Sequence, residues 1–264
     1  VESGVDTPEA IWETVLGRYP SLDAQYAAAR PQRPLELIPR VQRLLSRPAG
    51  RDWATLPLTF AYFDPMFSTG IAWSLLAVER LAGILEEASR SGSLEASAVE
   101  SGLERYGRQL PAEAAQMATL LEGAWAAMQD FELFTAQSFL YFAVVSFAEV
   151  EQRLWSAGRR GVHPAWQGFL GAGDAALERG FRQAKSRLES IPHAQRRVAS
   201  SPQREGFAHW LLETIADRNI AGFGDPQRRN LYPVDLDLLV DRASLLGMTP
   251  EQMRSHIPLL RGAI

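Results

Sequence analysis

The period of the hydrophobic pattern changes at Gly70, and this change constrains the fold more than any other feature. Before Gly70, residues 35–41 and 53–63 alternate or run apolar in the manner of strands. After it, apolar residues recur every three or four positions, on one helical face, at Ile71, Leu75, Val78, Ala82 and Leu85. Two strands alone are only marginally stable. The pattern therefore predicts a mainly α fold, with a helical domain preceded by a short antiparallel two-stranded remnant of a larger sheet.

Several further helices are expected downstream of Ser91-Gly92-Ser93, which breaks the pattern. Their approximate ranges are 96–108, 112–128, 131–155, 174–188, 205–217, 235–246 and a last short helix from 250. The most apolar window, residues 131–148, contains Glu132 and Gln137 and falls short of a full membrane span. We interpret it as a buried helix. The expected domain division is 1–92, carrying the strands and the helix from Gly70, and 93–264, a helical domain.

Composition excludes several classes of function. The chain of 264 residues has no cysteine, which rules out disulfides, thiolate catalysis and cysteine-ligated metals. A net charge of −4 makes nucleic acid an unfavourable partner. The stripe Glu205, His209 and Glu213 has ligand spacing, but we interpret it as a solvated helix face and expect no metal. A cytoplasmic protein without a membrane span is expected.

One segment, residues 63–75, combines a strand end, a tight turn and a helix start. Pro65 fixes one backbone dihedral, and Gly70 allows close backbone approach. The first turn of a helix offers amides without intrahelical acceptors, together with the positive end of the dipole. Such geometry suits an anion or the electron-rich pyrimidine edge of a flavin, although any strand–turn–helix junction has the same elements.

The segment Asp64-Pro-Met-Phe-Ser-Thr-Gly70 resembles the D-P-x-x-S-x-G segment of flavin-dependent halogenases and their monooxygenase relatives. The stretches 219–222 and 229–233 are also similar to members of this group. The resemblance implies a helix that points at the isoalloxazine ring of FAD, with a flavoprotein sheet before it. The implied cofactor-binding residues are Asp64, Pro65, Ser68, Thr69, Gly70 and Ile71. By resemblance, Asp64 and Pro65 would shape the turn, the amides of Gly70 and Ile71 would face the flavin, and Thr69 and Gly70 would line the halide position in a true halogenase.

Three departures from the family pattern matter. Many of these flavoproteins carry a Gly-Asp pair seven residues before Asp64, whereas Pro57 and Leu58 occupy those positions here. Phe67 stands where tryptophan halogenases have glutamate, so this side chain is neither acid nor base. The dinucleotide fingerprint G-x-G-x-x-G is absent upstream of Asp64.

These observations predict the C-terminal fragment of an FAD-dependent oxidoreductase, either a halogenase-like monooxygenase or a dehydrogenase. The fragment would contribute the flavin-facing helix and apolar walls of a pocket for a small-molecule substrate. FAD would bind in the intact parent and be absent from this chain, and the partner would be the missing N-terminal FAD-binding half. The isolated chain would be inactive. The alternative is a non-catalytic helical domain that binds a partner or a hydrophobic ligand.

Overall fold

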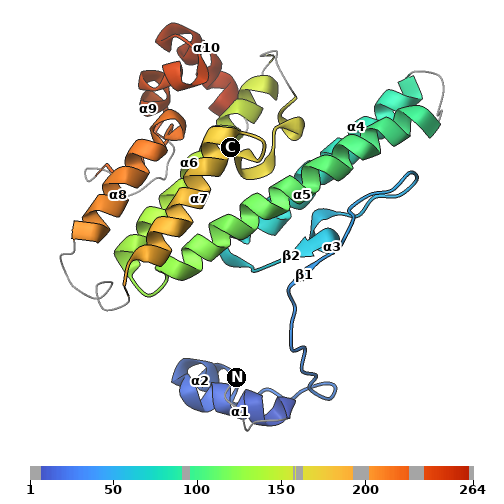
Figure 1. Cartoon of the computed structure of the whole chain (residues 1–264), viewed down its shortest axis with the longest axis vertical. Helices are drawn as coiled ribbons and strands as arrows, with labels where there is room; N and C mark the ends of the chain where they lie inside the picture. Colours follow the sequence, from blue (N-terminus) through green and yellow to red (C-terminus); the bar gives the residue numbers. More distant parts are fainter. Residues whose placement is uncertain are drawn as a thin grey trace. The chain divides into compact units, whose positions relative to one another are not determined.

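The computed structural model describes residues 7–90, 96–156, 158, 163–192, 202–225 and 235–261. The chain divides into two compact units, Val1–Arg43 and Leu44–Ile264 (Figure 1). This division falls at a different place from the expected boundary between residues 92 and 93, because the helices on both sides of that boundary build one core. The stretch 229–233 lies outside the described residues.

The first unit contains two short helices, α1 (Pro8–Arg18) and α2 (Pro20–Tyr26). Thr7 caps α1, because its hydroxyl accepts a hydrogen bond from the Ala10 amide at 3.2 Å. The rings of Trp12 and Tyr26 meet edge to face, with centroids 5.2 Å apart. No described residue of either helix is buried. This pair of helices therefore has no hydrophobic core of its own.

The two-stranded sheet is shorter than the sequence suggests. It pairs β1 (Arg43–Leu44) with β2 (Ala61–Tyr62), and an isolated antiparallel bridge joins Ala49 to Ala54. The expected strand 35–41 is wrong, since no strand is described there. The expected strand 53–63 is interrupted by the short helix α3 (Pro57–Phe60), because Pro57 lacks an amide donor for a sheet and suits a first helical position.

The second unit is built around three long helices. They are α4 (Thr69–Arg90), α5 (Ala96–Ala127) and α6 (Phe131–Ser156). The expected break between two helices near residue 110 is wrong, because α5 continues through Pro111. An internal proline costs a helix about 3 kcal/mol. Both halves of α5 bury side chains in one core, Tyr106 and Leu110 before the proline and Met117 after it, and this packing holds the helix together.

The remaining described helices are short. They are α7 (Ala175–Ser190), α8 (Pro202–Thr214), α9 (Leu236–Asp241) and α10 (Pro250–Arg261), with 3₁₀ turns at Pro164–Trp166, Phe169–Gly171, Ala216–Arg218 and Ala243–Leu246. α10 begins with a capping box: the Thr249 amide donates to the Gln252 side chain, and the Gln252 amide donates to the Thr249 hydroxyl. The mainly α fold with a two-stranded antiparallel sheet is confirmed.

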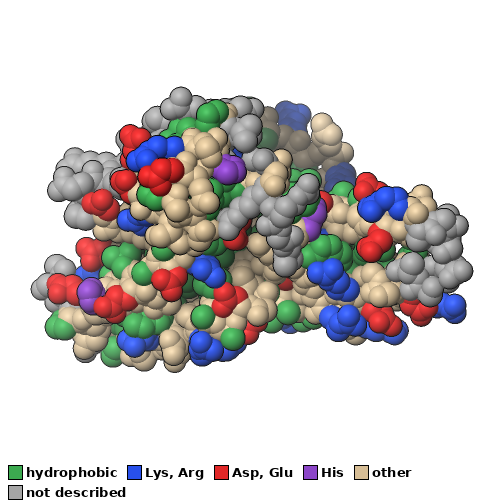
Figure 2. Space-filling view, turned by 90° about the horizontal axis from the view of Figure 1, so that it is seen from above, with side chains coloured by type: hydrophobic (Ala, Val, Ile, Leu, Met, Phe, Trp, Pro, Cys, Tyr) green, Lys and Arg blue, Asp and Glu red, His purple; other side chains and the backbone are tan. Residues whose placement is uncertain are grey.

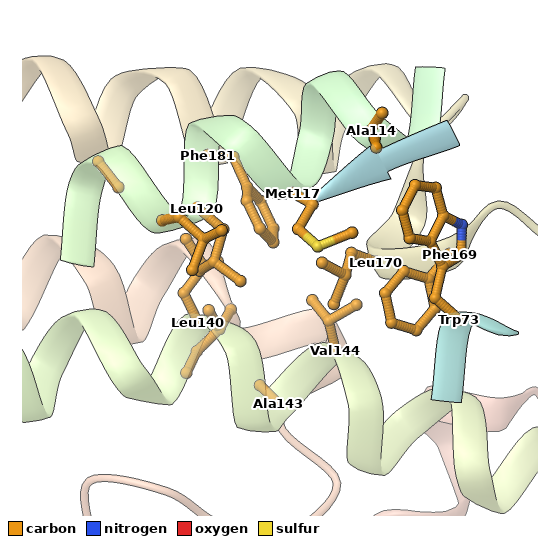
Figure 3. Packing of buried hydrophobic residues seen from close by; sticks show 14 of the residues in the cluster. Trp73, Ala114, Met117, Leu120, Leu140, Ala143, Val144, Phe169, Leu170 and Phe181 are labelled. Carbon is orange, nitrogen blue, oxygen red and sulfur yellow. The ribbon is translucent and has the colours of Figure 1, made fainter. Parts of the chain in front are cut away.

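The main core lies where α5 packs against α4, α6 and α7. Figure 3 shows Met117 of α5 beside Leu170, with the stacked rings of Trp73 and Phe169 on one side and Phe181 on the other. α6 contributes Leu140, Ala143 and Val144 to this core (Figure 3). However, Phe131 and Phe142 of the same helix are exposed. The expectation of a helix buried all round is therefore wrong, and α6 buries only part of its surface.

The apolar stripe that marked α4 in the sequence points away from the core. We call Ile71, Leu75, Val78, Ala82 and Leu85 the outer face of α4, and all five are exposed. The buried side chains belong to the inner face, which comprises Trp73, Ala77, Arg80, Ile84 and Ala88. The helix thus has two faces rich in apolar residues, and the one with smaller aliphatic residues and a buried arginine packs inside.

Two helical segments, Met66–Arg90 and Phe131–Ser156, are long and apolar enough to cross a membrane by length and composition alone. A core helix passes the same test, and 28% and 44% of their most apolar windows are buried within the chain. Basic and acidic side chains are interspersed over the surface drawn in Figure 2, without a large area of one sign among the residues described there. The sequence-based expectations that the chain has no membrane span and no nucleic-acid partner therefore stay predictions.

Candidate functional site

The segment singled out in the sequence folds into a tight turn that leads directly into α4. Asp64 begins the turn, because its carboxylate accepts a hydrogen bond from the Met66 amide at 2.8 Å. A 3₁₀ turn, Met66–Ser68, follows, and the Ser68 amide donates to the Pro65 carbonyl at 3.0 Å. The expected turn at Asp64–Gly70 that runs into a helix is confirmed. Asp64 closes this turn through its side chain, and the cofactor-binding roles that the resemblance implies for Asp64 and Pro65 stay predictions.

The turn holds two non-glycine residues in the left-handed region. Phe67 has φ 61° and Ser68 has φ 52°. Such conformations cost about 1–3 kcal/mol each and persist only where the surroundings impose them. Here the Phe67 ring stacks on Tyr141 of α6, with centroids 4.7 Å apart, and the Tyr141 hydroxyl donates to the Phe67 carbonyl at 3.2 Å. Tyr141 of α6 therefore holds the turn through one stacked ring and one hydrogen bond.

The Phe67 ring belongs to a larger aromatic cluster. It lies parallel to Phe134 at 6.2 Å and edge-on to Phe142 at 6.4 Å, and Phe142 in turn contacts Phe223. Burial raises the pKa of Tyr141 above its ordinary value, so its hydroxyl keeps its proton further into the alkaline range than an exposed tyrosine does. Together these rings form an apolar surface beside the turn. Its one hydroxyl, that of Tyr141, is already hydrogen-bonded to the Phe67 carbonyl.

Thr69 has a small side chain and Gly70 has none, and this allows the turn to pack closely against the neighbouring elements. Thr69 is buried as a whole residue, with its hydroxyl 3.3 Å from the sulfur of Met117, so it packs the turn against the core and does not reach the surface. A Cβ on Gly70 would lie 2.7 Å from a methyl carbon of Leu58. The close approach that Gly70 permits is thus with α3, at the position where the family pattern has an aspartate. A larger residue at 70 would disturb the fold itself.

The edge of the turn that remains accessible is formed by Pro65, Ser68 and Ile71, which are exposed, and by the half-buried Gly70. This edge includes the first turn of α4, where helix amides lack acceptors within the helix and the dipole is positive. The geometry fits the edge of a planar, electron-rich ring or a small anion. It brings Asp64, Pro65, Ser68, Thr69, Gly70 and Ile71 together in one turn, as their spacing requires, and the exposed side chains at its surface are those of Pro65, Ser68 and Ile71.

A buried ion pair joins the middle of α4 to α5. Arg80 and Glu113 of α5 are both fully buried, with Nη2 and Oε1 2.6 Å apart. Glu113 also accepts hydrogen bonds from the Trp73 indole at 2.7 Å and from the Phe169 amide at 2.8 Å. Arg80 donates to the carbonyl of Ala165. Arg80 does not belong to the apolar stripe of Ile71, Leu75, Val78, Ala82 and Leu85 that the sequence shows. Its place in line with Trp73, Ala77, Ile84 and Ala88 was the available signal.

A cavity of about 410 Å³ lies between the turn 46–51 and α5. Arg51 and Arg108 at its wall each lie 3.7 Å from a glutamate, Glu100 and Glu104 respectively. None of the residues of the Asp64–Ile71 turn lines this cavity. The cavity is therefore separate from the turn, and the arginines at its wall are already paired with glutamates.

Among the described residues no group of three or more histidine or acidic side chains is placed to hold a metal ion. In α8, His209 lies 3.3 Å from Glu213, and both side chains are largely exposed. This arrangement agrees with the solvated helix face inferred from the sequence.

Comparison with known proteins relates the fold to one group of enzymes. Neither a protein-family model nor a curated protein matches the chain. Among solved structures, the halogenase PltM matches with a TM-score of 0.58 and 20% identity over 81% of this chain. A PltM variant in complex with FAD gives the same values, and PltM in complex with phloroglucinol and FAD gives a TM-score of 0.57 and 21% identity. The fold resembles part of a halogenase, which confirms at the level of fold the resemblance that the Asp64–Gly70 segment indicated.

The chain spans 43% of the length of the PltM chains that it matches. More than half of that halogenase therefore has no counterpart here. The likeness shows the fold alone, and the activity of any larger protein has to be argued from the turn itself.

Proposed function

We propose that this chain is the C-terminal part of an FAD-dependent oxidoreductase, in which the first turn of α4 faces the flavin ring. The observation that supports this proposal is the coincidence of two independent signals at one place. The Asp64–Gly70 segment resembles a flavin-facing motif, and the chain folds it into an exposed helix start within a halogenase-like fold.

The turn would hold the flavin through its backbone. The amides of Gly70 and Ile71 and the positive end of the α4 dipole would stabilise negative charge on the pyrimidine edge of the ring. A bound flavin would supply the redox chemistry that these residues lack. Ile71 is exposed, and Leu58 fills the far side of Gly70, so the accessible side of the first turn is the side that carries Ile71.

The side chains beside the turn would act as walls. Phe67 has no proton to transfer, and the Tyr141 hydroxyl is bonded to the Phe67 carbonyl with a raised pKa. We therefore assign proton transfer to the FAD-binding half. This chain would supply fixed dipoles and an aromatic flank for a small-molecule substrate. Whether the parent acts as a halogenase-like monooxygenase or as a dehydrogenase is decided by groups in that other half. A cytoplasmic location is part of the proposal.

The test uses the complete open reading frame that contains this chain. We expect a G-x-G-x-x-G segment after its first strand and a yellow product with about one FAD per chain. The 264-residue chain alone should be colourless after incubation with FAD and gel filtration, because the phosphate-binding fingerprint supplies much of the affinity. A complete product without either the fingerprint or flavin would overturn the proposal.

A pair of substitutions at Ile71 tests the role of the helix start in that product. Ile71→Pro removes one amide proton from the first turn of α4, in which Ile71 is the third residue. Ile71→Ala removes the side chain but keeps the amide. We expect Ile71→Pro to lower FAD affinity or the flavin reduction potential, with Ile71→Ala close to wild type in both and unchanged melting curves for each. Equal effects of the two substitutions would show that the amide does not face the flavin. Gly70→Val is unsuitable, because of the contact with Leu58.

The alternative, a helical domain that binds a partner without catalysis, is favoured by one observation, the exposed outer face of α4. Flavin content of the complete product separates the two proposals, since a binding domain alone would leave that product colourless.

A further inference from the structure

The outer face of α4 is a continuous apolar surface on the same helix that begins at the candidate flavin site. Ile71, Leu75, Val78 and Leu85 are exposed by 68%, 65%, 49% and 56%. Their spacing of three or four residues aligns them along the helix. Single exposed aliphatic residues are ordinary on a protein surface, but an aligned row of them indicates a surface that another body covers.

The surface continues beyond the helix. Leu58 of α3 lies against Gly70 and is itself 36% exposed, so apolar contact area extends from the first turn of α4 onto α3. The accessible edge of the candidate flavin site, Ile71, is at the same time the first residue of the outer face. A body that presents a flavin edge to the start of α4 must therefore lie directly beside this face.

We propose that the outer face of α4 is the docking surface for the FAD-binding part of the same flavoprotein. This inference rests on the proposed function and names the partner of that site. The argument is the continuity of the face with the flavin site, together with the fact that more than half of the matched halogenase chain has no counterpart here. The stability of α4 within this chain comes from its inner face, which leaves the outer face available for that partner.

Charge argues against a lipid surface as the occupant. Glu79 and Glu86 flank the outer face, and Glu87 follows on the same helix. Helices that lie in a membrane interface carry lysine and arginine beside their apolar face, whereas acids repel anionic lipid. The opposite side of α4 is packed in the core of its own unit. α4 therefore presents one apolar row bordered by acids, which suits a protein surface.

The experiment compares two substitutions of exposed apolar residues by glutamate. Leu75→Glu lies at the centre of the outer face, and Trp125→Glu lies on α5 at a position that is 54% exposed. The upstream part of the open reading frame and the 264-residue chain are produced as separate polypeptides, and their association is measured by co-purification and by titration. We expect Leu75→Glu to weaken association by about tenfold or more, because a buried charge replaces a buried leucine. Trp125→Glu should change it by less than about threefold.

Equal binding of both variants would overturn the docking proposal. So would a stable homodimer of the wild-type chain in sedimentation velocity that Leu75→Glu alone disrupts, since a second copy would then occupy the face. Binding of the wild-type chain to phosphatidylcholine–phosphatidylglycerol vesicles that Leu75→Glu abolishes would assign the face to lipid and overturn it as well. Flavin content is measured on the upstream polypeptide independently. If that polypeptide binds FAD and Leu75→Glu leaves association unchanged, only the docking inference fails. If no preparation contains flavin, the proposed function fails.

Discussion

The two faces of α4 differ in composition and in what covers them. The inner face combines Trp73, the small residues Ala77 and Ala88, and a buried arginine, and it packs against α5 and the 163–171 segment. The outer face carries larger aliphatic side chains and is exposed. Small residues allow close approach of neighbouring helices, and Arg80 is accommodated because Glu113 and two carbonyls satisfy it. Hydrophobicity alone therefore does not identify which face of a helix is buried within a chain.

The largest expected effect concerns the inner face. Arg80→Met removes the positive partner of Glu113 and leaves a fully buried carboxylate whose remaining donors are neutral. Breaking a buried pair in this way costs about 3–5 kcal/mol of unfolding free energy. Chemical denaturation of both proteins measures the difference.

The matched control for Arg80→Met is Arg108→Met. Arg108 lies 3.7 Å from Glu104 one turn away on α5, and both side chains are largely exposed. Because solvent screens such a pair, its loss should change stability by about 0.5 kcal/mol or less. A similar small loss for Arg80→Met would mean that the ion pair does not anchor the inner face.

A smaller effect is expected where the core meets the strand segment. The Tyr106 hydroxyl of α5 donates to the Thr55 carbonyl at 2.8 Å, and burial raises the pKa of Tyr106 above its ordinary value of 10. Above about pH 10 the unfolded chain loses this proton more readily than the folded chain, so stability falls as pH rises, by up to about 1.4 kcal/mol per pH unit.

Tyr106→Phe should cost about 1–2 kcal/mol at neutral pH and flatten the loss of stability above about pH 10. Tyr19→Phe serves as the control, because Tyr19 is exposed in the first unit and should leave both the neutral value and the alkaline profile unchanged. An alkaline profile of Tyr106→Phe identical to that of the wild type would refute the role of this hydroxyl.

The sequence predicted the turn and most helix starts because those signals are local. Asp174 and Asp235 each cap a predicted helix through a side-chain oxygen, and an acid follows in the first turn. The Asp64–Gly70 turn was predicted for the same reason, since its side-chain hydrogen bond spans only two residues. The candidate site residues lie together because one turn contains them all.

What the sequence did not predict depends on contacts between distant residues. The continuity of α5 through Pro111 depends on burial of both its halves, and the partner of Arg80 lies 33 positions away. The left-handed conformation of Phe67 depends on Tyr141, 74 positions away. The strands were overestimated because alternating apolar residues such as Leu37, Ile38 and Val41 suggest a half-buried sheet, whereas all three are exposed in this chain.

Truncation of a side chain on the outer face of α4 should change stability least, and it can be compared directly with truncation on the inner face. Leu75→Ala and Ile84→Ala each shorten an aliphatic side chain to alanine within the same helix, so helix propensity favours both about equally. Ile84 is 6% exposed and packs against Gly102, so its truncation should cost about 2–5 kcal/mol. Leu75 is 65% exposed, so its truncation should change the stability of this chain by about 0.5 kcal/mol or less. A loss above about 1 kcal/mol for Leu75→Ala would show that the outer face is already covered within the 264-residue chain, and the FAD-binding half would then have to dock elsewhere.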